Sequence, residues 1–211
     1  NVPYANAIGI TMDTLMTDWR PYKHPVIGTM EDLDAATIDD VRAFYERYYV
    51  PNNATISVAG AVTVEQVREL AEEYFGWIPR GPEMAPLPEP SPTPRTDGER
   101  RRVIEDHLAT LPLVGMGFNI PPHGHEDTYA LELLSAIFST GESSRLNQRL
   151  VMDERAALQV ISFLNSRMGP GSILFYAFPN QGVEVGRIEA LIDEEIERLR
   201  TDGVTERELQ K

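Results

Sequence analysis

Seven of the sixteen prolines of this chain fall between residues 79 and 94, and this cluster limits the fold more than any other feature. Proline lacks a backbone N–H and has a fixed φ, so such a run favours an extended polyproline II conformation over helix or sheet. We therefore predict a semi-rigid linker over residues 80–99 that divides the chain in two. A proline-rich ligand for an aromatic-lined groove is the alternative interpretation.

On the N-terminal side of this linker, two capping boxes predict where helices begin. Thr37 and Thr63 are each followed, three positions later, by a side chain that can bond back to the capping residue, and apolar residues then recur at helical spacing. Between these helices, residues 54–61 (ATISVAGA) predict a strand. Residues 19–25 contain two prolines and predict a loop.

On the C-terminal side, the pattern predicts the element order β-β-α-α-β-β-α. The predicted strands cover residues 101–107, 111–120, 157–164 and 172–178, and the predicted helices begin at Asp127, at Ser143 or Ser144, and at Val185. The first of these helices has a predicted apolar face of Ala130, Leu133, Leu134, Ile137 and Phe138. Strands grouped in pairs predict an α+β fold, with helices packed on a largely antiparallel sheet.

A further capping box, Thr205 with Glu208, predicts a helix that begins near Glu206, only a few residues before Lys211. So short a helix is not stable by itself, so we expect the chain to be a piece of a longer polypeptide. A frayed native terminus is the alternative.

Charge and composition exclude several classes of function. The formal net charge is -14, which opposes binding to nucleic acid or to an anionic membrane. The chain has no cysteine, which excludes thiol catalysis, disulfides and Cys-ligated zinc.

No group of residues predicts a catalytic site from spacing. His123 and His125 stand next to acidic residues, but their i, i+2 spacing favours a solvated turn over a metal site. Residues 140–146 (TGESSRL) predict a helix cap, and an anion or a peptide terminus bound by backbone N–H groups is the alternative. The acidic stretch 193–195 is predicted on the polar face of a long helix.

An ordered series of segments resembles the M16 zinc metallopeptidases, the family of insulinase, pitrilysin and the mitochondrial processing peptidase, and most closely their shorter bacterial members. The segments are residues 21–28 (PYKHPVIG), 30–33 (MEDL), 40–45 (DVRAFY), 48–54 (YYVPNNA), 58–60 (VAG), 74–79 (YFGWIP) and 141–151 (GESSRLNQRLV). The resemblance therefore extends over essentially the whole chain.

This resemblance implies a domain organisation. Residues 1–79 would be the C-terminal part of a first half-domain, residues 80–99 the linker, and residues 100–211 a second half-domain that is truncated at its C-terminal end. In the family, zinc is held by a His-x-x-Glu-His helix and a distal Glu, and the resemblance places both before Asn1. It therefore implies no catalytic residue and no metal ligand in this chain, and leaves the substrate-binding residues unknown.

Two departures from the family pattern bear on substrate binding. Arg20 stands where the family often has His, and Gln159 lies in a strand where relatives often carry a Tyr that grips the substrate backbone. Neither position is therefore assigned a role.

For the whole protein, the resemblance implies a zinc-dependent metalloendopeptidase that hydrolyses peptides or unfolded polypeptides, to which this chain contributes the chamber wall and no zinc ligand. The implied partners are the peptide substrate, the upstream half-domain and a second lobe or subunit, with no nucleic acid and no membrane. The alternatives are a non-catalytic M16-like subunit and a free-standing peptide-binding domain. A periplasmic or secreted location is expected, with the cytoplasm as the alternative.

Overall fold

The computed structural model of the chain describes residues 3–4, 8, 12–17, 19–24, 26, 28–86, 88–89 and 98–210. These residues form two compact units, one of Val26–Pro88 and a larger one of Asn1–Pro25 with Glu89–Lys211. The predicted division of the chain at residues 80–99 stays a prediction, and within this linker residues 87 and 90–97 lie outside the described part.

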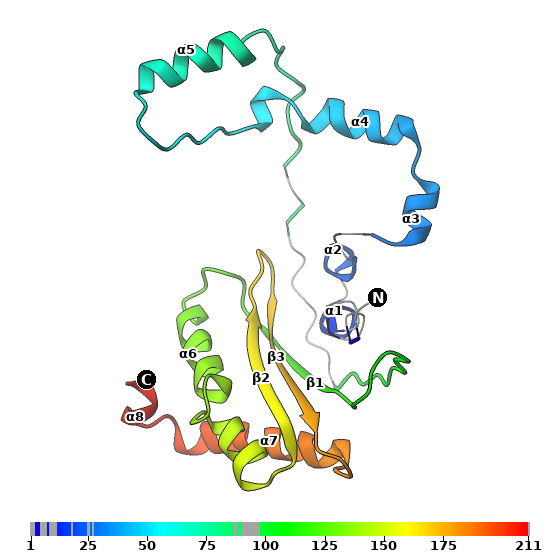
Figure 1. Ribbon diagram of the computed structural model, residues 1–211, viewed down its shortest axis with the longest axis vertical. Coiled ribbons are helices and arrows are strands. Elements are labelled where there is room, and N and C mark those ends of the chain that lie inside the picture. The colour runs from blue at the N-terminus through cyan, green and yellow to red at the C-terminus, as the bar shows by residue number, and fades with distance from the viewer. Residues whose placement is uncertain are drawn as a thin grey trace. The chain divides into compact units, whose positions relative to one another are not determined.

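The smaller unit consists of helices whose starts are set locally. Its elements are α3 (Met30–Ala35), α4 (Ile38–Tyr48), the 3-10 turn η2 (Pro51–Asn53) and α5 (Val64–Phe75), seen in Figure 1. Thr29, Thr37 and Thr63 each accept a hydrogen bond from the backbone N–H three residues later, and the side chain at that position accepts one from the capping residue. The predicted boxes at Thr37 and Thr63 are therefore confirmed, and the box at Thr29 is an addition.

The predicted strand over residues 54–61 is wrong for the structure described, in which these residues carry no strand assignment. A strand exists only when a neighbour pairs with its backbone groups, and the described residues of this unit provide no such neighbour. The side chain of Asn52 instead connects η2 to the segment that follows α5. Its Oδ1 accepts from the Gly81 N–H at 2.8 Å, and its Nδ2 donates to the Pro82 carbonyl at 3.0 Å.

The larger unit is built on an antiparallel sheet of β1 (Val114–Ile120), β2 (Ala157–Asn165) and β3 (Gly171–Pro179) in the order β1-β3-β2. Val114 lies opposite Ala177, and Ile161 lies opposite Tyr176. The hairpin of β2 and β3 is therefore as predicted. The strand predicted over residues 101–107 is absent from the described structure, again because those residues have no paired neighbour there.

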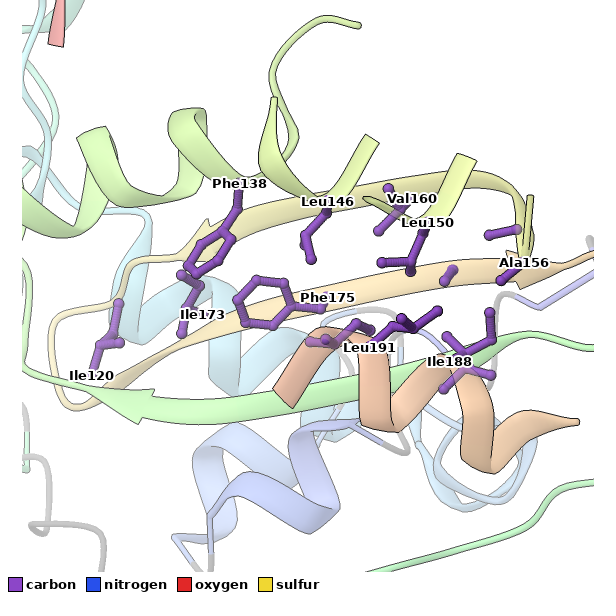
Figure 2. Close-up of a cluster of buried hydrophobic side chains, with 14 residues drawn as sticks. Ile120, Phe138, Leu146, Leu150, Ala156, Val160, Ile173, Phe175, Ile188 and Leu191 are labelled. Atoms are coloured by element: carbon purple, nitrogen blue, oxygen red, sulfur yellow. The ribbon is translucent and has the colours of Figure 1, made fainter. Parts of the chain in front are cut away.

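One face of this sheet is covered by α6 (Thr128–Ser139), the π-helix η3 (Asn147–Asp153) and α7 (Val185–Asp202), after which α8 (Glu206–Leu209) follows. The short helical segment predicted from Ser143 or Ser144 thus appears mainly as η3, and the helix predicted from Glu206 is confirmed. Figure 2 shows side chains from the helices and from the strands meeting in one core. Its largest fully buried apolar members are Phe138, Leu146, Leu150, Phe175, Ile188, Leu191 and Ile192.

The opposite face of the sheet is met by the N-terminal segment, which contains α1 (Met12–Met16) and α2 (Arg20–Lys23). Ile8, Leu15 and Leu113 pack against Leu174 and Tyr176 on this face.

The loop predicted over residues 19–25 is wrong in part, because residues 20–23 form the helix α2. Pro21 lies within the first turn of α2, where the missing N–H has no helical partner to lose. The Tyr22 hydroxyl accepts from the Gly169 N–H at 2.6 Å, and the Arg167 guanidinium lies 4.6 Å from the centre of the Tyr22 ring. This short helix is therefore held by contacts with the turn between β2 and β3.

The apolar face predicted for α6 is shifted in the structure. Leu133 is 54% exposed, whereas Leu131, Leu134, Ser135 and Phe138 face the core. No helix in the described part of the chain is long and apolar enough to span a bilayer.

Candidate functional site

The segment that begins at Gly141 closes on itself through a tight turn. Gly141 has a φ of +79°, a conformation that glycine adopts without strain. The Ser144 hydroxyl donates to the Gly141 carbonyl at 2.7 Å, and the Ser144 carbonyl accepts from the Gln148 N–H at 2.9 Å. The predicted helix start is therefore correct. The predicted cap is not formed by Ser144, however, because its hydroxyl donates to a carbonyl, whereas an N-cap side chain accepts from an N–H, and no side chain caps η3.

Arg145, the most motif-like residue of this segment, is used inside the fold. Its Nε and Nη2 lie 2.6 Å and 2.9 Å from the two carboxylate oxygens of Glu208, and Nη2 also donates to the Gly203 carbonyl at 2.7 Å. Both side chains of the pair are mostly buried, with exposed fractions of 14% and 19%. The hydrogen bonds from Arg145 lower the pKa of Glu208 to about 2. Arg145 therefore anchors the connection between α7 and α8.

A second group of charges joins η3 to α7. Arg149 lies 2.9 Å from Glu154 and 3.0 Å from Glu194, and Arg187 reaches the same two carboxylates at 3.0 Å and 3.5 Å. These four side chains form a network in which each arginine contacts both acids. This network gives Glu194, in the acidic stretch 193–195, a structural role.

Glu195 corrects the prediction that residues 193–195 all lie on the polar face of their helix. Its side chain is only 2% exposed, its Oε1 accepts from Arg198 Nη1 at 2.8 Å, and the Arg149 Nε lies 3.9 Å away. The sequence contains a signal for this burial, because Glu195 follows Ile188 and Leu191 at helical spacing and so lies on the apolar stripe of the helix.

The histidines do not form a metal site in the described structure. His123 Nδ1 lies 3.2 Å from the Ser166 hydroxyl, and the Asp127 N–H donates to His125 Nδ1 at 3.2 Å. Within the described residues, no group of three or more His, Cys, Asp or Glu could hold a metal ion. The described residues thus present no cluster that fits zinc, and the prediction that the chain supplies no zinc ligand stays a prediction.

Of the two positions that depart from the family pattern, the structure describes the side chain of Gln159 but not that of Arg20. Gln159 lies on β2 opposite Phe178 and is exposed, as is its neighbour Leu158. The side chain of Arg20 lies outside the described part of the structure. The structure therefore assigns no substrate contact to either position.

A concavity of the larger unit runs along β1. Its volume is about 940 Å³, and its lining includes β1 residues, residues 98–104, Leu15, Tyr176 and Glu189. Ligand pockets in proteins typically measure roughly 300–1,000 Å³, so this groove has the size of a binding site. We refer to it below as the β1 groove.

Comparison with known proteins shows consistent matches over most of the chain. Residues 35–211 match the family model described as the peptidase M16 inactive domain. The zinc protease PqqE of Helicobacter pylori (strain ATCC 700392 / 26695) is 32% identical over 194 residues, which cover 92% of this chain and 44% of the relative. An uncharacterized zinc protease of Bacillus subtilis (strain 168), YmxG, is 27% identical over 187 residues, which are 89% of this chain and 44% of that protein.

Solved structures agree with these matches. A protease from Helicobacter pylori aligns with a TM-score of 0.79 at 30% identity, over 92% of this chain and 47% of that one. A peptidase M16 inactive domain from Pseudomonas fluorescens aligns with a TM-score of 0.72 at 17% identity, over 95% of this chain and 48% of that one, which supports the fold. The chain thus spans less than half the length of these relatives. On this evidence, the chain belongs to the M16 family of zinc metallopeptidases and contains the fold of its inactive domain.

Proposed function

We propose that this chain is the non-catalytic body of a zinc-dependent metalloendopeptidase that hydrolyses peptides or unfolded polypeptides. The observation that carries this function is the match of residues 35–211 to the M16 inactive domain. Relatives named zinc proteases are about twice as long as this chain, so the full-length protein has room for a separate catalytic part.

The chemistry of the described residues supports a structural role for this part of the protein. Arg145 is engaged by Glu208, and Arg149 by Glu154 and Glu194. No group of described residues offers three metal ligands. We propose that zinc, together with the base that activates its bound water, is held by the polypeptide outside residues 1–211.

The smaller unit is assigned to a half-domain that residues before Asn1 complete. Its helix α4 has an apolar face of Val41, Phe44, Tyr45 and Tyr48, all of which are exposed in the described structure. Ile56 and Val58, in the predicted strand, are exposed as well. An apolar helix stripe and an unpaired alternating segment are both suited to docking on a sheet. The partner assigned to them is the catalytic half of the same polypeptide.

The test uses the full-length protein and the fragment 1–211 side by side. We expect the full-length protein to contain one zinc ion per chain by elemental analysis and to cleave unfolded peptides until zinc is chelated. The fragment is expected to bind no stoichiometric zinc and to cleave nothing. A full-length protein without zinc and without cleavage would contradict the function, and tight zinc binding by the fragment would contradict the assignment of ligands.

A non-catalytic M16-like subunit, which binds peptide or supports a peptidase complex, is the second candidate. The absence of a three-ligand group among the described residues is compatible with it. The residues that precede Asn1 in the full-length protein separate the two candidates, since a His-x-x-Glu-His motif there indicates the enzyme. The expected periplasmic or secreted location stays a prediction.

A further inference from the structure

The N-terminal segment, meaning the described residues between positions 3 and 24, packs on a part of the chain that is distant in sequence. The family resemblance assigns this segment to the first half-domain, and its contacts lie on the larger unit, after the proline linker. The next residues along the chain form the smaller unit, Val26–Pro88. The segment thus precedes the smaller unit in sequence, but it is bound to residues on the other side of the linker.

Tyr4 fixes one end of this segment. Its backbone N–H donates to Asp106 Oδ2 at 2.8 Å. Its hydroxyl donates to the Leu111 carbonyl at 2.9 Å and accepts from the Leu111 N–H at 3.2 Å. Its ring meets Phe178 edge to face, with the ring centres 5.4 Å apart. A hydroxyl that both donates and accepts, on a ring with an edge-to-face contact, holds this side chain in one orientation.

The backbone of Tyr4 is strained. Its φ is +63°, in the left-handed region that residues with a side chain rarely adopt. Such a conformation persists only where the surrounding contacts outweigh its cost. Asp106, Leu111 and Phe178 supply these contacts, so the strain identifies Tyr4 as a residue that tertiary structure holds in place.

The middle of the segment lies on the second face of the sheet. Ile8 and Leu15 pack against Leu174 and Tyr176, and the Tyr176 hydroxyl donates to the Ile8 carbonyl at 3.1 Å. Arg100 Nη1 donates to the Leu15 carbonyl at 3.2 Å, and Leu15 also forms part of the wall of the β1 groove. Apolar packing and hydrogen bonds to the backbone therefore act together here.

Tyr22 fixes the other end of the segment. Its hydroxyl accepts from the Gly169 N–H at 2.6 Å, and the Arg167 guanidinium lies over its ring. Gly169 lies just before β3 begins, whereas Phe178, the ring contact of Tyr4, lies at the end of β3. The strand between them is roughly 30 Å long, so the segment is held at two widely separated points.

We propose that the N-terminal segment is the interface by which the catalytic half of the full-length protein is bound to the larger unit, with Tyr4 and Tyr22 as its main contributors. The proposal rests on the proposed function, which places the catalytic part before Asn1. It goes further by stating that the halves stay associated without an intact proline linker. Tyrosine and arginine are the residue types that most often dominate the binding energy of an interface, and both occur here.

Cutting the linker of the full-length protein tests this proposal. A recognition site for a sequence-specific protease is inserted after Glu89, and the cut protein is followed by gel filtration and sedimentation. The two pieces of the natural sequence are expected to stay together. Tyr4→Ala combined with Tyr22→Ala is expected to raise their dissociation constant by about 30-fold or more. Tyr129→Ala, at a 76% exposed position on α6, is the matched control and should leave it unchanged.

Two gentler variants guard against a loss of folding. Tyr4→Phe keeps the ring and removes only the hydroxyl that contacts Leu111, so the dissociation constant should rise by about 3- to 10-fold. Arg167→Ala leaves the first piece unaltered and removes the contact with the Tyr22 ring, which should raise it about fivefold. Pieces of the natural sequence that separate once the linker is cut would overturn the proposal. So would a dissociation constant that none of these tyrosine and arginine variants changes.

Hydrogen exchange of the uncut full-length protein gives a second measurement. The Leu111 amide, which donates to the Tyr4 hydroxyl, is expected to exchange slowly and to exchange faster in Tyr4→Phe. Equal exchange in the two proteins would contradict the role of Tyr4. Neither measurement requires zinc or cleavage, so halves that stay bound in a protein without peptidase activity would count against the proposed function alone.

Discussion

At the scale of single residues, Arg145 shows that a residue in a motif-like segment can have a structural role. It lies in the segment that most resembles a functional loop, yet its guanidinium is bound to Glu208, which is 63 positions away in the sequence. A bidentate arginine–carboxylate pair combines charge with fixed geometry, which makes it a strong tether between helices. The partner was not predictable, because nothing in the local sequence relates residue 145 to residue 208.

This tether predicts a pH dependence of stability. Because the pKa of Glu208 is lowered from 4.5 to about 2 in the folded chain, its contribution is complete above pH 4.5 and is lost as the pH falls toward 2. Glu208→Gln should cost about 1.5–3 kcal/mol at pH 7 and much less at pH 2. Urea denaturation followed by circular dichroism at several pH values measures this.

The exposed neighbour Glu206 provides the control, since Glu206→Gln should leave both the stability and its pH dependence nearly unchanged. Equal pH profiles for the natural chain and Glu208→Gln would show that the pair contributes nothing.

Burial of single side chains was predicted with mixed success. Phe138 was correctly placed in the core, but Leu133 was wrongly placed there and Glu195 was wrongly placed on the surface. Helical spacing defines a stripe of residues but leaves its centre uncertain by about one position. Which residues of the stripe are buried depends on the orientation in which the helix packs on the sheet.

At the scale of elements, helix starts and strands behaved differently. The capping boxes at Thr37, Thr63 and Thr205 are confirmed, because each consists of contacts between residues three positions apart. The hairpin of β2 and β3 is confirmed because both of its strands lie within the chain. The strands predicted at 54–61 and 101–107 are wrong for the described structure, because pairing requires a neighbour that local sequence does not supply.

The contact between α6 and β2 predicts the effect of a small substitution. Ser139→Ala removes the acceptor of the Ser162 N–H, whose bond is 2.7 Å long, and leaves a partly buried donor without its partner. We expect the free energy of unfolding to fall by about 1–3 kcal/mol. Ser57→Ala, at an exposed position, should change it by no more than about 0.5 kcal/mol. Similar values for the two variants in urea denaturation would show that the hydrogen bond between Ser162 and Ser139 does not stabilise the packing of α6 on β2.

At the scale of the whole molecule, the two units differ in how their apolar residues are placed. The larger unit has a buried core, whereas the smaller unit leaves Phe44 57% exposed. Large apolar groups that are exposed together usually mark a surface that contacts another part of a protein. The smaller unit is therefore expected to gain its core only in the full-length protein.

A charged substitution on α4 tests this expectation. Phe44→Glu should change the unfolding of the fragment 1–211 by about 0.5 kcal/mol or less. In the full-length protein, the same change should destabilise the half-domain by about 2–4 kcal/mol, because it would bury a charge at an apolar contact. Ala43→Glu adds the same charge beside the apolar face and serves as the control. Equal effects of Phe44→Glu in both proteins, measured by hydrogen exchange of α4, would contradict the docking.

The sequence by itself determined the starts of the helices, the α+β class with its antiparallel hairpin, and the resemblance to the M16 family. These features depend on residues that are close along the chain or on the order of motifs. Only the tertiary structure decided the partner of Arg145, the burial of Glu195 and the pairing of β1 with β3. The physical reason is that burial and pairing are set by groups distant in sequence, whereas a helix cap is completed within one turn.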